Sequence, residues 1–480
     1  MKNRNLLPIL LGCAFASANA HAATELLAIG SISGAFGDLA TQTAAPLENG
    51  VAGNLLGGVG SGIAYAGGNT FLVVPDRGPN AVSYNPLIDD TASYINRFQT
   101  FDLSLAPSAP GSTVPFSLTP KLTATTLLYS STPLVYGTGA LGTDATHTLG
   151  SGAPALNTTD KFYFTGRSDN FDPTKLSTNP SNARFDPESI RVSNDGKSVF
   201  ISDEYGPYVY QFDRATGQRL KSFKLPDNLA VPNLSAAGNA EIGGNTVGRV
   251  ANKGMEGLAI TPDGKTLVGI MQAPLEQDGG KTVRIVTIDV ATGTTHEYAY
   301  TLTTGSGVSD IVAINDHQFL VDERDGKGLG DGSTAAVKQL FEIDISGAQD
   351  VTAISGSANL AAKAVSKTLF VDLVALLTAN GIAANAIPAK IEGLAFGPDV
   401  TVNGQLQHTL IVTNDNDFLD PYVGGVNNPN NFYVLGIDAS TLSTFQAQQL
   451  TAVPEPSTCA LMLAGLGVGA FVARRKRRAG

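Results

Sequence analysis

The chain has 480 residues, and its 42 Asp and Glu outnumber its 31 Lys and Arg. Seven of these cations lie in the two end segments described below, so the region between them carries a net charge near −18. Such a region has no basic patch that could neutralise the phosphates of a nucleic acid, which excludes nucleic acid as an expected partner. An acidic surface suits the binding of divalent cations, or it serves solubility alone.

The N-terminal residues 1–22 have the parts of a secretory signal peptide. Lys2 and Arg4 precede an apolar run over residues 6–16, and a stretch of small residues ends at Ala22. We therefore expect export with cleavage after Ala22. A buried N-terminal helix is the alternative.

A strand–turn–strand pattern recurs five times between residues 61 and 415. Its clearest copy is "MEGLAITPDGKTLVGIM" (residues 255–271), where a carboxylate heads an apolar strand, a tight turn follows, and a second strand returns. The other copies begin at Ser61, Glu188, Ser309 and Glu392. Period-two alternation with Gly, Asn and Asp at the turns favours strands over helices.

A third strand that ends in Asp follows each pair, and a fourth follows several of them. Repeated units of three or four antiparallel strands are typical of propeller blades. We therefore predict an all-β fold, a β-propeller over residues 23–450 with blades of about four strands. The interval between Asp102 and Glu188, with "KFYFTGRSD" as one strand, leaves room for a further blade, so six blades are predicted. A two-sheet sandwich is the structural alternative.

Two segments interrupt the repeats. Residues 103–160 are rich in Ser, Thr, Pro and Gly, which indicates loops with short strands. Residues 358–380 carry apolar side chains at helical spacing, which predicts one inserted amphipathic helix packed on the propeller.

The C-terminal residues 453–480 form a second end segment. "VPEP" is followed by an apolar stretch at about 459–473, which is short for a stable membrane span, and by five cations at 474–478. The cations would stay on the cytoplasmic side of a membrane. Both cysteines, Cys13 and Cys459, lie in the end segments, so we expect no disulfide in the central domain.

This order of parts resembles the PEP-CTERM sorting signal of Gram-negative bacteria, in which the Pro-Glu-Pro motif marks processing by an exosortase-type transpeptidase. The resemblance implies a tail that holds the chain transiently in the inner membrane, an exosortase-type partner, and a final place at the cell surface or in the extracellular matrix. A plain tail anchor is the alternative.

The repeat predicts where its acidic residues meet. In each hairpin the start of the first strand and the end of the second lie at the same end of the sheet, and blades around an axis bring these ends to one mouth. We therefore expect a ring of carboxylates there, with Arg77 and Arg324 between them. Its members are Asp76, Glu188, Asp203, Glu204, Glu256, Glu323, Glu392 and Asp415.

Like charges this close are costly unless a cation compensates them. Ca²⁺, which takes roughly six to eight oxygen ligands, fits such a ring, and the arginines could then clamp an anionic group such as a phosphate. The structural alternative is that the carboxylates cap strand ends or face water. Other chemistries have little support, because the chain has no G-x-S-x-G elbow, no cysteine nucleophile in the central domain and no histidines at metal-ligand spacing.

Several segments are similar to the phytase-like family, also called "esterase-like activity of phytase", over roughly residues 45–440. They are "DPESIRVSNDGKSVFISDEYGPYVYQFD", "NKGMEGLAITPDGKTLVGIMQAPL", "FLVDERDG" and "KIEGLAFGPD". The resemblance implies a propeller related to calcium-dependent alkaline phytases, which use clustered Ca²⁺ ions to bind phosphate and activate a water. On matching positions it points to Glu188, Asp203, Glu204, Glu256, Glu323, Arg324 and Glu392.

The leading hypothesis is an exported, monomeric, calcium-dependent phosphoesterase or esterase that acts through a metal-bound water at the acidic mouth. Glu256, Arg77 and Arg324 are the predicted catalytic residues, and the carboxylate ring holds the metal. One alternative is a non-catalytic surface or matrix propeller that binds polysaccharide or protein with structural calcium. A lactonase-type propeller would keep the metal and change the substrate.

Overall fold

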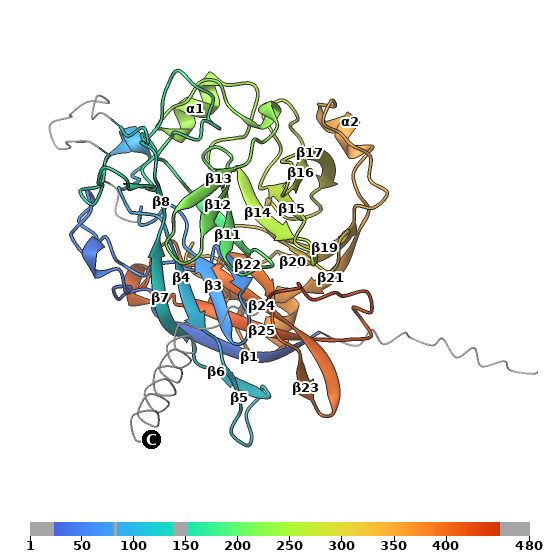
Figure 1. The fold of residues 1–480 in the computed structure, drawn as a ribbon. Helices are drawn as coiled ribbons and strands as arrows, with labels where there is room; N and C mark the ends of the chain where they lie inside the picture. Colours follow the sequence, from blue (N-terminus) through green and yellow to red (C-terminus); the bar gives the residue numbers. More distant parts are fainter. Residues whose placement is uncertain (1–23, 81–83, 138–151, 452–480) are drawn as a thin grey trace, which may run out of the picture.

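The computed structural model describes residues 24–80, 84–137 and 152–451, and it arranges them as a propeller of five antiparallel blades (Figure 1). Each blade has four strands in sequence order from the axis outward, apart from the last. The first blade contains β2 (Gly62–Tyr65), β3 (Thr70–Val74), β4 (Arg97–Asp102) and β7 (Lys121–Leu127). The second contains β10 (Pro187–Val192), β11 (Ser198–Asp203), β12 (Val209–Asp213) and β13 (Arg219–Ser222).

The third blade contains β14 (Met255–Ile260), β15 (Thr266–Met271), β16 (Thr282–Asp289) and β17 (Thr295–Thr301). The fourth contains β18 (Gly307–Ala313), β19 (Gln318–Arg324), β20 (Lys338–Asp344) and β21 (Lys367–Asp372). The fifth contains β22 (Lys390–Phe396), β24 (Gln405–Asp415), β25 (Asn430–Asp438) and β1 (Glu25–Ile32), and the short β23 (Val400–Val402) pairs with β24.

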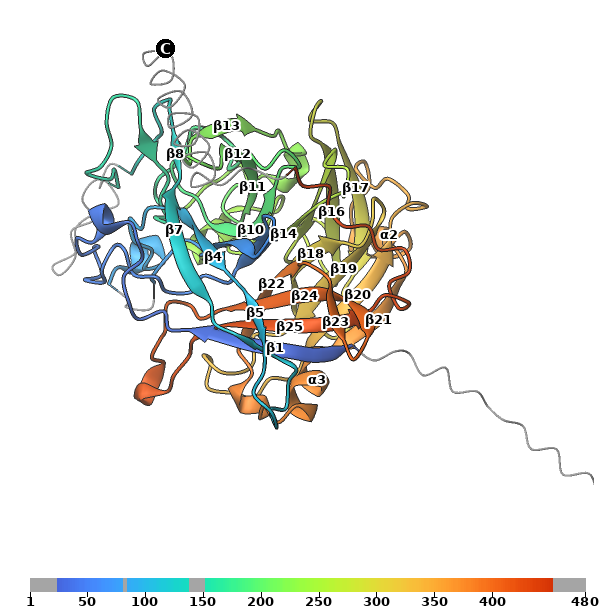
Figure 2. The same ribbon diagram turned by 60° about the horizontal axis from the view of Figure 1, so that its bottom comes forward.

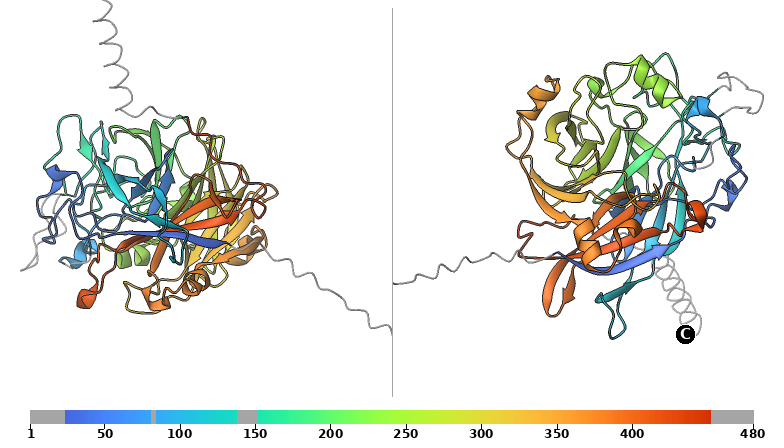
Figure 3. Two further views of the ribbon diagram at one scale, coloured as in Figure 1. Left: turned by 90° about the horizontal axis from the view of Figure 1, so that it is seen from below. Right: turned by 180° about the vertical axis from the view of Figure 1, so that it is seen from behind.

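The ring is closed in two ways. The inner strands β2, β10, β14, β18 and β22 contact one another in that order, and β22 returns to β2. The blades therefore follow one another around the ring in sequence order, as the colours in Figure 3 show. The N-terminal strand β1 pairs antiparallel with β25, so the two ends of the domain share the fifth blade (Figure 2). Apolar residues fill the spaces between neighbouring sheets, as the alternation of the strands requires.

The blade count corrects the expectation of six. In the described part of the interval before Glu188, the chain forms β5 (Leu105–Pro107) paired with β6 (Phe116–Leu118), and β8 (Tyr129–Ser130) paired with β9 (Phe162–Tyr163). These strands are too short to make a blade, and β7 from the same interval completes the first blade. The expectation of loops with short strands over residues 103–160 fits this arrangement.

The expected single helix over residues 358–380 is also corrected. The segment forms α2 (Ser357–Ala361), then β21, then α3 (Leu373–Ala379). The middle of the segment pairs with β20 because that edge of the fourth blade would otherwise lack its outer strand. Asp372 ends the strand and caps the helix by accepting a hydrogen bond from the Ala375 amide (2.9 Å).

The remaining helices lie in the connections. They are α1 (Gly238–Gly244) and the single turns of 3-10 helix η1 (Thr41–Thr43), η2 (Pro86–Ile88), η3 (Asp227–Leu229), η4 (Ala384–Ala386) and η5 (Val423–Gly425). Within the described residues no helix has the length and apolar character needed to cross a membrane. The expected signal peptide (1–22) and sorting tail (453–480) lie outside those residues.

A buried ion pair fills the propeller axis. Arg191 of β10 donates to Asp310 of β18 (2.9 Å), and Asp310 also accepts the amides of Leu394 (2.9 Å) and Leu258 (3.3 Å) from two further inner strands. The axis is therefore closed below the mouth, and the acidic residues lie on one side of this plug.

Candidate functional site

Four inner strands carry a β-bulge at their mouth end. The register shifts between Pro187 and Ile190, between Met255 and Gly257, between Val308 and Ile311, and between Ile391 and Leu394. Bulges redirect side chains and often occur beside functional sites. Here they coincide with Glu188, Glu256, Ser309 and Glu392, four of the five residues that head the repeat in the sequence.

Three buried carboxylates form the first cluster. One oxygen from each of Asp186, Glu188 and Glu204 lies within 4.8 Å of the others. Burial, and next the charge of Glu256, raise the pKa of Glu188 well above its usual range. Arg77 neutralises part of the cluster, because its Nη1 lies 2.7 Å from Asp186 Oδ2 and its amide donates to Asp186 Oδ1 (2.9 Å).

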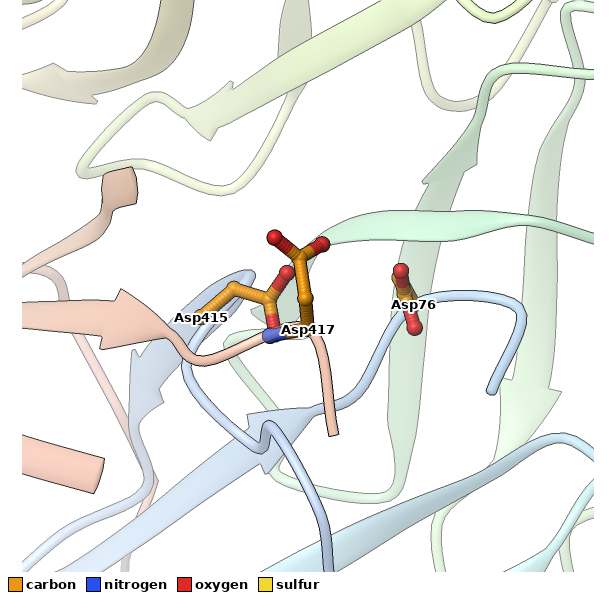
Figure 4. Close-up of side chains that lie close together, drawn as sticks. All are labelled: Asp76, Asp415 and Asp417. Atoms are coloured by element: carbon orange, nitrogen blue, oxygen red, sulfur yellow. The ribbon is translucent and has the colours of Figure 1, made fainter. Parts of the chain in front are cut away.

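A second cluster lies where the first and fifth blades meet. Asp76, which follows β3, faces Asp415 and Asp417 at the end of β24, with oxygens within 4.8 Å of one another (Figure 4). Burial and Asp415 raise the pKa of Asp76. Lys390 Nζ lies 3.0 Å from Asp415 Oδ2 and also contacts Asp417. Burial opposes ionisation of Asp417, but Lys390 outweighs it and lowers the pKa of Asp417.

Glu256, Glu392 and Arg324 form a third group at the mouth. Arg324 Nη2 lies 2.5 Å from Glu392 Oε1 and 3.5 Å from Glu256 Oε1, and its Nε donates to the Ser309 hydroxyl (2.5 Å). Gln272 donates to Glu256 Oε1 (2.9 Å), as the hairpin geometry predicts. Burial raises the pKa of Glu392 to about 7, and burial with Glu204 raises that of Glu256.

Several carboxylate oxygens at the mouth are buried without a hydrogen-bond partner in the described chain. They are Glu204 Oε1, Glu256 Oε2 and Glu392 Oε2, and the three residues are only 2–3% exposed. The carboxyl groups of Glu204 and Glu256 also lie close enough for a shared proton to join them, whereas two ionised groups would repel each other. A buried carboxylate oxygen left unpaired is costly, so a ligand that supplies positive charge would stabilise it. The all-oxygen donor set fits a hard cation such as Ca²⁺.

The structure does not bring two of the predicted residues into these clusters. Asp203 accepts the backbone amides of Asp186 and Gly206, both at 2.6 Å, so each of its oxygens is used in shaping the loop. Glu323 accepts from the Tyr300 hydroxyl (2.7 Å) and contacts Lys367 of β21. It points away from the mouth because successive strand residues face opposite sides, and its neighbour Arg324 takes the mouth side.

Three residues of the site are not among those predicted from the sequence: Asp186, Asp417 and Lys390. Asp186 directly precedes the repeat in "DPES", and Asp417 completes an Asp-x-Asp spacing in "NDND". Lys390 lies two residues before Glu392, a spacing that can put both side chains on one face of a strand. These spacings are visible in the sequence, but all three residues lie outside the positions of the strand–turn–strand repeat from which the carboxylate ring was predicted.

Comparison with known proteins gives two matches to family models. The model "Phytase-like: Esterase-like activity of phytase" matches residues 54–418, and the PEP-CTERM protein-sorting motif matches residues 452–478. An uncharacterized secreted protein of Arthroderma benhamiae is 38% identical over 142 residues, which cover 25% of this chain and 27% of the relative. The chain thus spans about a quarter of that relative's length.

Among solved structures, hydrazine synthase of Kuenenia stuttgartiensis matches with 12% identity and a TM-score of 0.31, over 74% of this chain and 76% of that one. Sqt1 of Saccharomyces cerevisiae matches with 8% identity and a TM-score of 0.29, over 77% and 69%. These likenesses are too distant to inform the site.

Proposed function

The chain belongs to the phytase-like family, and from that premise we propose that its acidic mouth binds Ca²⁺ and hydrolyses phosphoesters or related esters. The observation that carries this proposal is the set of buried, unpartnered carboxylate oxygens beside the guanidinium of Arg324. A propeller that used these residues only as strand caps would pair them with backbone amides, as Asp203 is paired.

Two carboxylate clusters would hold the metal. They are Asp186, Glu188 and Glu204 on one side, and Asp76, Asp415 and Asp417 on the other. When bound, Ca²⁺ would supply Lewis acidity, which favours ionisation of a water and withdraws charge from an ester oxygen. The carboxyl groups of Glu256 and Glu392 lie close enough to Glu188 of the first cluster for their negative charges to raise its pKa.

The chain's own residues have separable roles in this scheme. Arg324 and Arg77 would hold anionic oxygens of the ester and stabilise charge that develops on them. Glu256, whose Oε2 meets no donor of the described chain and whose carboxyl group contacts that of Glu204, would accept a proton from an attacking water. Glu392, with a pKa of about 7, keeps Arg324 in position and exchanges protons near neutral pH.

The test is an assay of the mature domain against phosphomonoesters, phosphodiesters, carboxylic esters and lactones, with Ca²⁺ and with chelator. We expect turnover that needs Ca²⁺ and falls at least 100-fold in Glu256→Gln, since loss of a general base costs about 10²–10⁴ in rate. Glu342→Gln, on the third strand of the fourth blade, is the matched control and should keep full activity. Absence of turnover on every substrate would overturn the proposal.

The sorting motif favours a second candidate function, because such signals accompany exported surface proteins. The chain is exported, and we propose that its tail is held in the inner membrane of a Gram-negative cell and handed to an exosortase-type enzyme. In that setting the propeller could bind matrix polysaccharide or protein, with calcium only structural. Ca²⁺-dependent binding to purified matrix, without turnover in the ester panel, would select this function.

A further inference from the structure

The chain that follows β25 crosses the end of the propeller opposite to the acidic mouth. We call residues 442–451 the strap. It contacts the turns between the first and second strands of three blades, whereas the mouth carboxylates lie at the other ends of those same hairpins. Backbone amides of Gln446, Gln449 and Thr451 donate in turn to the carbonyls of Ile314 (2.8 Å), Pro262 (3.0 Å) and Asn194 (2.7 Å).

Side chains fasten the strap to this turn face. The Phe445 ring packs on Phe396 with ring centres 4.5 Å apart, and Gln448 Nε2 donates to Val192 O (2.7 Å) and Asn194 Oδ1 (2.8 Å). Residues 445–448 also line a cavity of about 80 Å³ at this end of the axis, together with Arg191. The strap is therefore bound from the fifth blade to the second, and it passes close to the propeller axis.

The sorting tail begins where the strap ends. The motif matches residues 452–478, and the apolar stretch of the tail starts near Cys459, only eight residues after Thr451. Eight fully extended residues reach at most about 29 Å. To bring the mouth to the bilayer, the tether would have to run outward over a four-stranded blade and down its side, because it cannot pass through the closed ring. Strands spaced about 4.8 Å apart, and an inner strand of 6 residues, make that path about 35 Å long. The tether is thus shorter than the path that it would need.

We propose that the strap fixes the orientation of the anchored propeller, with the turn face toward the membrane and the acidic mouth toward the medium. This inference rests on the membrane anchoring proposed above, and it adds the face that the membrane meets. It needs no adhesion between the turn face and lipid, because the short tether alone prevents the mouth from reaching the bilayer. The mouth then receives soluble or matrix-bound substrates and not membrane lipids.

The full-length chain in lipid nanodiscs tests this orientation. Cys459→Ser removes the tail cysteine, and Cys13 leaves with the signal peptide, so single reporters can be introduced on a cysteine-free chain. Four exposed lysines serve as matched positions: Lys197→Cys and Lys265→Cys in the turns, and Lys253→Cys and Lys327→Cys in the loops at the mouth. Each cysteine carries an environment-insensitive fluorophore, and spin-labelled lipid headgroups act as quenchers.

We expect quenching at least twofold stronger at the two turn positions than at the two mouth positions. A flexible Gly-Ser insert of about 20 residues after Thr451 lengthens the tether and should abolish the difference. Equal quenching at all four positions, or stronger quenching at the mouth, would overturn the orientation. A chain that fails to stay with the nanodisc overturns the anchoring as well, whereas the ester assay on the free domain is unaffected by either result.

Discussion

Among the carboxyl groups at the mouth, Glu392 has a raised pKa that lies near neutral pH. Burial raises its pKa from 4.5 to about 7, although Arg324 opposes the rise. The folded domain therefore holds this proton more tightly than the unfolded chain does. Its contribution of about 3 kcal/mol is complete below the unfolded pKa and is lost as the pH rises through 7. We predict that the Tm without metal falls between about pH 5 and pH 8, and falls less steeply in Glu392→Gln.

Calcium offers the control for this prediction. If the cation takes the place of the proton, saturating Ca²⁺ should remove most of the fall in Tm in the wild-type domain. Differential scanning fluorimetry across this pH range, in chelator and in Ca²⁺, measures both effects. The assignment fails if the variant and the wild type show the same pH slope in chelator.

Asp310 joins the inner strands at the propeller axis, so its charge matters for stability. Neutralising it would leave Arg191 as a buried cation without its partner, 2.9 Å away. Breaking a buried pair in this way costs about 3–5 kcal/mol, which is the destabilisation expected for Asp310→Asn. Asp316→Asn, in the exposed turn of the same hairpin, should change the free energy of unfolding by less than about 0.5 kcal/mol. Urea denaturation compares the two, and equal midpoints would contradict the role of the plug.

Recurrence is what makes Glu256 and Glu392 predictable, since each heads a copy of the repeat. The repeat does not predict the direction of the Glu323 side chain, because a position at the end of a strand does not determine which side of the sheet a side chain faces. It also misses Asp417 and Asp186, which reach the clusters through loop geometry outside the repeat. Side-chain direction at a bulge depends on the local register, and the register is visible only when the partner strand is known.

At the scale of elements, glycine lets the bulged inner strands approach one another. A Cβ on Gly257 of β14 would lie 2.8 Å from Asp310 Cα of β18, closer than such atoms normally come. Gly257→Ala should therefore overpack the ring and destabilise the domain by about 1–3 kcal/mol. Gly347→Ala is the control, because a Cβ there meets no atom of the described chain within 4 Å. Thermal melts compare them, and a Gly257→Ala domain as stable as this control would argue against close packing at the axis.

Strands with strict period-two alternation are predicted well from the sequence. Strands that complete a blade with a partner far away in the sequence are not. The segment 367–372 reads as helix in isolation because its apolar residues continue the spacing of its neighbours. It becomes β21 because β20 presents an unpaired edge. The local sequence pattern of this segment does not show the pairing, because the edge belongs to a strand more than twenty residues earlier in the chain.

At the scale of the whole molecule, the number of blades is set by closure and not by the length of the chain. The five repeats found in the sequence already form a closed ring, so the interval before Glu188 adds no blade. It supplies β7, the outer strand of the first blade, and otherwise forms connections and short strands. The sequence cannot reveal this, because the outer strand of the fifth blade comes from the N-terminus. Glu25 and Ile32 bound a strand whose partner lies about 400 residues later.

This closure predicts that the N-terminal strand stabilises the entire ring. Leu27 of β1 is fully buried against the first and fifth blades, whereas Leu369 of β21, on the equivalent outer strand of the fourth blade, is 49% exposed. Leu27→Ala should cost about 2–5 kcal/mol of unfolding free energy, and Leu369→Ala less than about 0.5 kcal/mol. Because β1 connects the two ends of the domain, the loss should appear as one shifted transition that is the same by fluorescence and by circular dichroism. Two separate transitions in Leu27→Ala, or equal stability of the two variants, would mean that the blades do not depend on this strand for closure.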